Sequence, residues 1–218
     1  MLRKIFICAA LVTALLAAGC GGEEKIVGTP DKAVLACAEI IMTGDSENLS
    51  AAGLSADDKN ALRLAVANSF IKSMKKIAPL SEESAQALTQ IYFDKLKGNV
   101  AFKTTLKSNG DKPVVELTTT PIDQAATAKT SAADNNEIIA LVGMVGKLKA
   151  DGATEDQLTS SPDVQKLAVS ALTKYIDCIA FQPEKTFEIT CQKVSGADGT
   201  AHWAPEDGKA LIDLLAGQ

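Results

Sequence analysis

Histidine and aromatic side chains are scarce in this 218-residue chain, which has one histidine, one tryptophan, two tyrosines and six phenylalanines. It has no Cys-x-x-Cys and no His-x₃-His pair, so a zinc site would need ligands scattered along the sequence. It also lacks the Gly-x-Ser-x-Gly elbow of serine hydrolases, and Gly143 and Gly146 lie in a helical pattern instead of following a strand. The sequence therefore predicts no metal site, no cofactor site and no catalytic serine.

Positive charge is also limited, since the formal net charge is −5. Residues 1–19 hold Arg3 and Lys4 and no acidic residue, so without them the formal charge falls to −7. Such a chain is unsuited to coating nucleic acid, where clustered Lys and Arg supply the affinity. About 199 residues with 46% apolar content suffice for one large or two small domains, and the composition is typical of a helix-rich soluble protein.

The one long apolar run is at the N-terminus, where Arg3-Lys4 precedes Ile5–Ala18 and then Gly19-Cys20. This run is shorter than the roughly 20 residues needed to span a bilayer, and with its basic flank it predicts a secretory signal peptide over residues 1–19.

The ending Leu16-Ala17-Ala18-Gly19-Cys20 resembles a bacterial lipobox. That resemblance implies cleavage before Cys20, diacylglycerol on its thiol and an acyl chain such as palmitate on the new amino group. The alternative is an ordinary signal peptide that happens to contain a cysteine. Residues 20–28 would then be the lipidated Cys20 and a short tether, of which the eight residues after Cys20 reach at most about 25–30 Å.

Helix signals recur along the remaining chain. Thr29 is a suitable N-cap with Pro30 as first helical residue, and Gly44 follows the last apolar position. Ser55, Ser81 and Ser161-Pro162 begin further helices in the same way. We expect a loop over 123–131 and a helix over 132–149 with one apolar face, made by Ile138, Leu141, Val142, Val145 and Leu148. A short helix closes the chain over 205–215.

A first hairpin is predicted from Val100–Lys107 and Lys112–Ile122, which alternate in polarity around Asn109-Gly110. A type I′ turn at Asn109-Gly110 would pair residues whose numbers sum to 219, so that Phe102 faces Leu117 and Thr104 faces Val115.

A second hairpin is predicted from Thr186–Val194 and Thr200–Trp203. A three-residue Ala-Asp-Gly loop would pair residues whose numbers sum to 396. Cys191 and Trp203 then share one face, Trp203 points into the core and His202 points away, so no Cys191–His202 catalytic pair forms. A two- or four-residue loop would place His202 on the face of the thiol instead.

The order of elements resembles bacterial lipoproteins with a nuclear transport factor 2-like, cystatin-like domain. The residues that carry the resemblance are Pro30–Val34, Val114–Asp123 and Trp203–Leu215. It implies an α+β fold in which a long helix crosses a small, about four-stranded antiparallel sheet. We therefore expect one domain over 29–218, with a helical insertion at about 124–182.

Three cysteines remain beyond Cys20, and each follows the apolar face of its element: Cys37, Cys178 and Cys191. They are either three buried thiols or one disulfide with a thiol left over, and Cys178 and Cys191 are nearest in sequence.

The carboxylates offer weak candidates for a nuclear transport factor 2-like acid or base. Glu39 lies off the apolar stripe of its helix, Glu116 lies on the polar side of its strand, and Asp123 ends a strand beside Pro121. The lysine cluster Lys72, Lys75 and Lys76 is expected to be a solvated helix end.

The sequence favours an exported lipoprotein, anchored to the cell membrane or outer membrane through Cys20, that acts as a non-enzymatic surface module binding an envelope protein or a small ligand. The alternative is a nuclear transport factor 2-like hydrolase or isomerase with a carboxylate in a conical pocket.

Overall fold

The computed structural model describes residues 25–134, 136–195 and 200–217. The fold is α+β, and its residues gather into two compact units. The described residues of the first, here the helical unit, are 67–98 and 123–180. Those of the second, here the sheet unit, are 25–66, 99–122 and 181–217 with the gap at 196–199.

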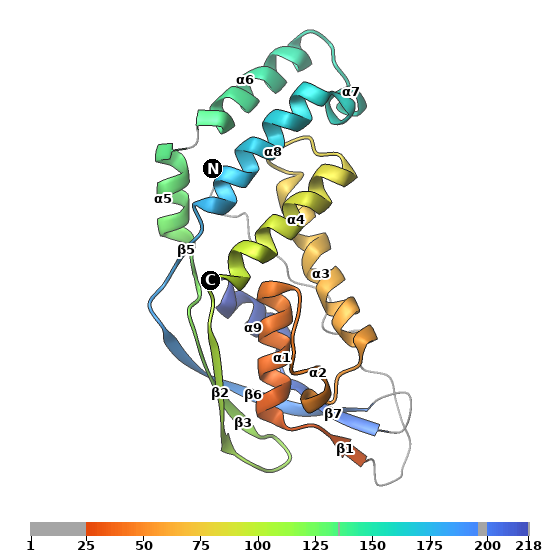
Figure 1. Cartoon of the computed structure of the whole chain (residues 1–218), viewed down its shortest axis with the longest axis vertical. Coiled ribbons are helices and arrows are strands. Elements are labelled where there is room, and N and C mark those ends of the chain that lie inside the picture. Colours follow the sequence, from red (N-terminus) through yellow and green to blue (C-terminus); the bar gives the residue numbers. More distant parts are fainter. Residues whose placement is uncertain (1–24, 135, 196–199, 218) are drawn as a thin grey trace. The chain divides into compact units, whose positions relative to one another are not determined.

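The sheet unit is built on a five-stranded mixed sheet of order β1-β7-β6-β3-β2 (Figure 1). Its strands are β1 (Lys25–Val27), β2 (Phe102–Ser108), β3 (Val114–Thr119), β6 (Lys185–Ser195) and β7 (Thr200–Pro205). Its helices are α1 (Pro30–Thr43), α2 (Leu49–Ala52), α9 (Gly208–Leu215) and the first part of α3 (Ala56–Met74). The sequence predicts an antiparallel sheet of about four strands, whereas this sheet has five and is mixed, because β1 runs parallel to β7.

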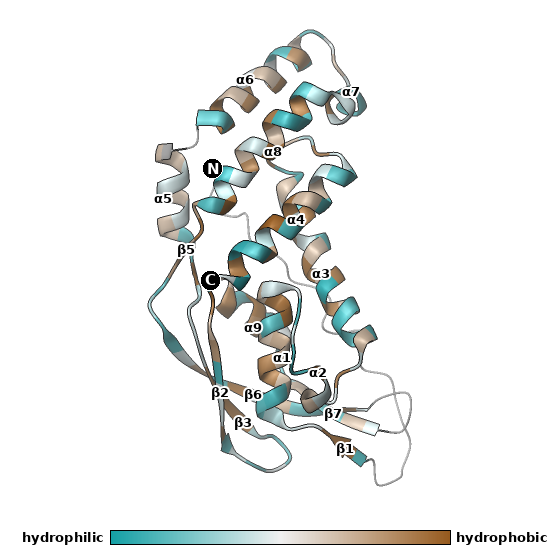
Figure 2. Cartoon of the chain, viewed as in Figure 1, coloured by the Kyte–Doolittle hydropathy of each residue, from teal (hydrophilic) through white to brown (hydrophobic). Residues whose placement is uncertain are grey.

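Helix α1 begins and ends where the sequence predicts. Thr29 is its N-cap, Pro30 its first residue, and Gly44 closes it in the left-handed region with φ 74°. The helix packs against β2, β3, β6 and β7, and most of its apolar residues are buried, whereas Leu35 and Cys37 are half-buried. Figure 2 shows hydrophobic residues along this helix and along the strands behind it. The core of the sheet unit therefore lies between α1 and one face of the sheet.

The first hairpin has a different register from the prediction. Phe102 pairs with Thr119 and Thr104 with Leu117, so the numbers sum to 221, and the register shifts between Leu106 and Ser108. A type I′ turn needs positive φ at both central residues, here Asn109 and Gly110. Asn109 does not meet this condition, because no non-glycine residue of the described chain has positive φ. Pro113 has no N–H to donate to a neighbouring strand, and its carbonyl accepts a hydrogen bond from the Cys191 N–H at 2.8 Å. Because the slip is two residues, Val115 and Leu117 still face the core and are fully buried.

The second hairpin has the predicted register, with Cys191 opposite Pro205 and Lys193 opposite Trp203, both pairs summing to 396. The loop on which that prediction rested, 197–199, lies outside the described residues. Trp203 is buried, as predicted, at 8% exposure.

The helical unit contains the end of α3 and five further helices. They are α4 (Glu82–Lys97), α5 (Gln124–Asp134), α6 (Asn136–Ala150), α7 (Glu155–Ser160) and α8 (Pro162–Asp177). The short strands β4 (Ile122–Asp123) and β5 (Ala180–Phe181) pair with each other where the chain passes between the units. Helix α8 packs against α4, α5, α6 and α7, so it is the centre of this unit.

Side-chain caps fix these helices, as the sequence predicts. Ser81 accepts from Ser84 N–H at 3.1 Å, and Ser161 accepts from Val164 N–H at 3.4 Å. Gln165 of α8 then accepts from Ser81 N–H at 2.9 Å and donates to the Pro79 carbonyl at 2.8 Å, which ties α8 to the start of α4.

The loop predicted over 123–131 is wrong, because this stretch forms α5. The Asp123 carboxylate accepts from Ala126 N–H at 2.8 Å and so caps the helix. The face predicted for the next helix is only partly buried. Leu141 is 2% exposed, whereas Val142 is 62% exposed, because α6 contacts α8 along one side only.

Candidate functional site

The lipidation residue predicted from the sequence, Cys20, lies outside the described residues. The structure begins five positions later at Lys25, and residues 25–27, which we expected in the tether, form β1. Lys25, Ile26 and Val27 pair in parallel with Thr200, Ala201 and His202. The chain is therefore fixed to the sheet earlier than the sequence suggested.

Two glycines hold β1 in place. Gly28 follows the strand with φ 78°, and a Cβ there would lie 2.4 Å from the carbonyl carbon of Ala52. Gly53 has φ 75°, and a Cβ there would lie 2.5 Å from the Val27 carbonyl oxygen and 3.3 Å from His202 Cβ. Thr29 N–H also donates to the Ala51 carbonyl at 3.3 Å. The end of β1 is thus clamped between β7 and the C-terminus of α2, with no room for a side chain at either glycine.

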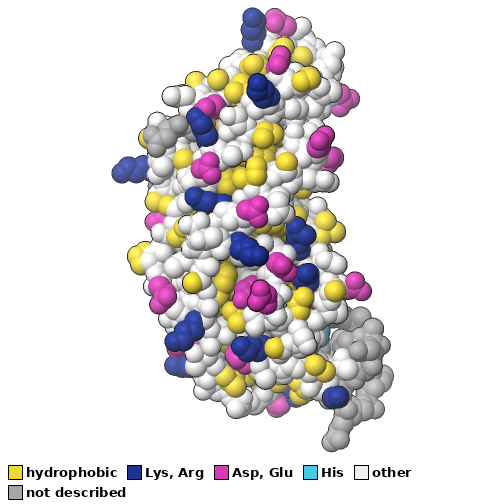
Figure 3. All heavy atoms as spheres, in the orientation of Figure 1, with side chains coloured by type: hydrophobic (Ala, Val, Ile, Leu, Met, Phe, Trp, Pro, Cys, Tyr) yellow, Lys and Arg dark blue, Asp and Glu magenta, His cyan; other side chains and the backbone are white. Residues whose placement is uncertain are grey.

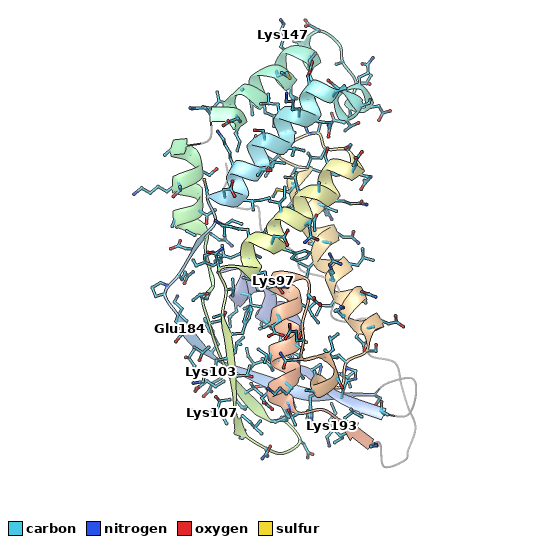
Figure 4. All side chains as sticks on the ribbon, in the orientation of Figure 1. Lys97, Lys103, Lys107, Lys147, Glu184 and Lys193 are labelled. Carbon is cyan, nitrogen blue, oxygen red and sulfur yellow. The ribbon has the colours of Figure 1, made fainter. Side chains whose placement is uncertain are left out.

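The register of β1, β7 and β6 places Ile26, Trp203 and Lys193 on one face of these strands. Ile26 is 40% exposed, and the Lys193 ammonium lies 5.6 Å from the centre of the Trp203 ring and 4.0 Å from Asp111 Oδ1. In Figure 4, Lys193 lies at the β7 side of the sheet, whereas Lys103 and Lys107 lie along β2. We name Ile26, Lys193 and Trp203, together with Lys25, which precedes Ile26 on β1 and points to the opposite face, the β1 end.

His202 lies on the opposite face from Cys191. It pairs with Val27 on one side and Val194 on the other, and adjacent residues of a strand point to opposite faces. The predicted absence of a Cys191–His202 pair therefore follows from the register. His202 points away from the face of Cys191 and Trp203, as predicted, but it is only 8% exposed, because β1 and Gly53 flank it.

Cys37, Cys178 and Cys191 are present as thiols, with no disulfide between any two of them. Cys37 on α1 and Cys191 on β6 lie in the sheet unit, and Cys178 caps α8 in the helical unit. Burial raises the pKa of the Cys37 thiol to about 12, and Cys191 and Asp58 act in the same direction. Burial also raises the pKa of Cys191 to about 12, with a contribution from Asp31. At neutral pH both are protonated thiols, which are poor nucleophiles and poor metal ligands.

Each of the three candidate carboxylates has a structural partner. Glu39, expected to be solvated, accepts from Ser46 Oγ at 2.5 Å and from Asn48 Nδ2 at 3.1 Å, and so fixes the connection from α1 to α2. Glu116 forms an ion pair with Lys107 at 2.9 Å, and Asp123 caps α5. None of them is held in an apolar wall as an unpaired acid.

In the predicted lysine cluster, Lys72, Lys75 and Lys76 are all exposed, as expected, and Lys75 pairs with Glu82. On α6, a hydrogen bond from Lys174 holds the pKa of Glu137 below its usual value. Figure 3 shows acidic and basic side chains interspersed over the visible face, without a large area of one sign.

The side of the sheet away from its buried core positions is polar. Cross-strand neighbours there are joined by the Lys107–Glu116 ion pair and by Thr118 Oγ1 and Thr186 Oγ1, 3.0 Å apart. We name these side chains, which are exposed or half-buried, the outer face: Lys103, Thr105, Lys107, Glu116, Thr118, Thr186 and Glu188.

Among the described residues, no group of three or more His, Cys, Asp and Glu side chains is arranged to hold a metal ion. In the same part of the chain, none of the helices has both the length and the apolar character needed to cross a bilayer.

Sequence reasoning missed the β1 end and its two glycines. The Lys25-Ile26-Val27 triplet has β-branched residues, but three residues are too few to predict a strand. Gly28 could have been noticed as a glycine between an apolar pair and a helix cap.

Comparison with known proteins adds one similar fold. Neither a family model nor a curated protein matches the sequence. A crystal structure from Bacillus subtilis subsp. subtilis str. 168, provisionally described as that of a lipoprotein (ycdA), is similar with a TM-score of 0.54 and 15% identity. The alignment covers 85% of this chain and 54% of that one, so the present chain spans about half of that protein. At this identity the likeness concerns the fold alone.

Proposed function

We propose that the protein is an exported lipoprotein, cut before Cys20 and anchored by lipid on that residue. The observation that carries the proposal is the basic, apolar and Leu-Ala-Ala-Gly-Cys order of residues 1–20. The similar fold of a protein described provisionally as a lipoprotein supports it. Two or three acyl chains hold a protein at a membrane far more firmly than one.

Mass spectrometry of membrane fractions tests this proposal directly. We expect a mature chain that begins at a lipid-modified Cys20, and Cys20→Ala should release the protein or leave the precursor uncut. Cys8→Ala is the matched control, because it removes a thiol of the leader and should leave processing unchanged. Unmodified Cys20 at mature length in the soluble fraction would refute the anchor.

We further propose that the sheet unit acts as a non-enzymatic binding module, through its outer face. The support is that Thr118 and Thr186 present hydroxyls on a side of the sheet that α1 does not cover, beside the Lys107–Glu116 pair. The carboxylates considered for the enzyme alternative, Glu39, Glu116 and Asp123, each have a structural partner, which favours the binding module. The nuclear transport factor 2-like assignment stays a proposal, supported by α1 crossing the antiparallel strands β7-β6-β3-β2.

Purification of the intact lipidated protein from membranes tests the binding module. A protein or small molecule that is retained by the unmodified chain should be lost with Thr118→Arg, in the middle of the outer face. It should be kept with Gln86→Arg, which places the same side chain on an exposed position of α4. Equal retention by both variants would exclude the outer face as the binding surface.

A further inference from the structure

The β1 end lies very close to the residue that carries the proposed anchor. Only Gly21–Glu24 separate Cys20 from Lys25, and five residue steps span at most about 18 Å when fully extended. Because Lys25 is already paired with Thr200, this limit applies to the distance between Cys20 and the sheet itself.

The direction of β1 defines which part of the sheet is near the anchor. Parallel pairing puts the start of β1 beside the start of β7, and the antiparallel pairing of β7 with β6 adds the last residues of β6. Strand β2 is at the other edge of the five-stranded sheet, four strand spacings away, which is roughly 19 Å. The two edges of the sheet can therefore be distinguished by a probe of short range.

The chemistry of the β1 end fits a phospholipid surface. In residues 25–27, 193–195 and 200–203, the charged side chains are Lys25 and Lys193, both basic, and the two acidic residues Glu23 and Glu24 precede Lys25 in the sequence. Asp111 lies 4.0 Å from Lys193, and its own side chain is fully exposed. Ile26 is 40% exposed and follows Lys25 on β1, while the Lys193 side chain lies over the Trp203 ring on β6 and β7. An exposed isoleucine at this edge can enter the headgroup layer while the two ammonium groups meet lipid phosphates.

We propose that the β1 end rests on the phospholipid headgroups of the membrane that holds the anchor, with Ile26 at the headgroup boundary and Lys25 and Lys193 on phosphates. This orientation rests on the proposed lipidation of Cys20. It leaves β2 and its edge of the sheet directed away from the bilayer, where the outer face beside it is open to a partner.

The single tryptophan makes this orientation measurable without a label, since Trp203 belongs to the β1 end. The intact lipidated protein is reconstituted into vesicles of phosphatidylcholine and phosphatidylglycerol, with or without bromine near the headgroup end of the acyl chains. Bromine quenches tryptophan only at short range. We expect a loss of Trp203 emission in the brominated vesicles relative to the unbrominated ones.

A reporter at the other edge provides the control. The double variant Trp203→Phe with Thr105→Trp moves the indole to an exposed position of β2, and its emission should be the same in both vesicles. Lys25→Glu should weaken the quenching of Trp203, whereas Lys103→Glu, the same charge change on β2, should leave it intact. Circular dichroism of each variant shows whether it is folded.

Flotation of the vesicles tests the lipid anchor on Cys20 separately from the orientation of the β1 end. If the protein does not float with the vesicles, the anchor fails and the orientation falls with it. If it floats but Trp203 is not quenched, or if both reporters are quenched equally, the orientation is refuted and the anchor stands. Quenching of Trp203 alone, weakened by Lys25→Glu but not by Lys103→Glu, supports the proposal.

Discussion

The two units are held together in different ways. In the helical unit, the contacts that begin a helix are local, such as the cap from Ser81 to Ser84, whereas the contact of Gln165 with Pro79 joins distant segments. In the sheet unit, each strand pair except the two hairpins joins residues far apart in sequence, such as Lys25 with Thr200 and Leu117 with Phe187. Helix caps can be predicted from short patterns, whereas the pairing of strands that are distant in sequence cannot.

The largest expected effect compares one leucine in each core. Leu117→Ala in the sheet unit and Leu172→Ala in the helical unit both truncate fully buried side chains, so each should cost about 2–5 kcal/mol of unfolding free energy. Trp203 emission reports the sheet unit, and far-ultraviolet circular dichroism is dominated by helices. We expect Leu117→Ala to shift the urea transition seen by Trp203 most, and Leu172→Ala to shift the dichroism transition most.

The exposed Lys103→Ala is the control for this comparison and should stay within about 0.5 kcal/mol of the unmodified protein. If both probes report the same transition in both leucine variants, the two units unfold as one.

Two glycine-to-alanine substitutions should change the stability of the protein in opposite directions. Gly28→Ala forces a Cβ to 2.4 Å from the Ala52 backbone at φ 78°, and the positive φ alone costs about 1–2 kcal/mol. Gly143→Ala fills open space on α6 and should stabilise by about 0.5–1 kcal/mol. Thermal unfolding of both variants measures the difference, and a neutral Gly28→Ala would mean that β1 is not clamped.

Removal of a cap should affect the helical unit by a smaller amount. Ser81→Ala leaves the Ser84 N–H without its acceptor and should cost about 1 kcal/mol, whereas Ser81→Gly should cost only a few tenths. The loss of stability should shift the unfolding transition seen by circular dichroism, and it should shift the transition seen by Trp203 emission much less. Equal loss for alanine and glycine would argue against the cap.

The smallest expected effect is a pH dependence in α6. Because Lys174 lowers the pKa of Glu137 in the folded state, the ion pair stabilises the protein above the usual glutamate pKa, and this stabilisation disappears as the pH falls through the lowered folded value. Glu137→Gln should therefore lower the urea midpoint slightly at neutral pH and have no effect in acid. The same difference at both pH values would contradict the assignment.

Much of the helical part of the fold could be predicted from the sequence. Thr29-Pro30, Ser81 and Ser161-Pro162 begin α1, α4 and α8 as predicted. The serine side chains cap α4 and α8 within three residues, and Pro30 is the first residue of α1. Helix α5 was missed because its Ala, Thr and Gln residues carry no apolar periodicity and its start depends on Asp123 alone.

The sheet shows where short patterns are insufficient. The register of β6 with β7 was correct, but the register of β2 with β3 was wrong by two residues, because Pro113 and the bulge near Ser108 lengthen the loop. The pairing of β1 could not be predicted, since its partner lies 175 residues away. The proposed lipidation site is the reverse case, because its motif is contiguous and is predicted without reference to the fold.

The parallel pairing of β1 with β7 also orders the folding of the chain in time. A polypeptide that leaves a ribosome or an export channel emerges N-terminus first, so residues 25–27 are available long before residues 200–202. Until β7 has emerged, β1 has no partner strand, and closing so long a loop is slow relative to forming the helices between them. The pairing of β1 with β7 is thus completed only after residues 200–202 have emerged, later than the helices between them.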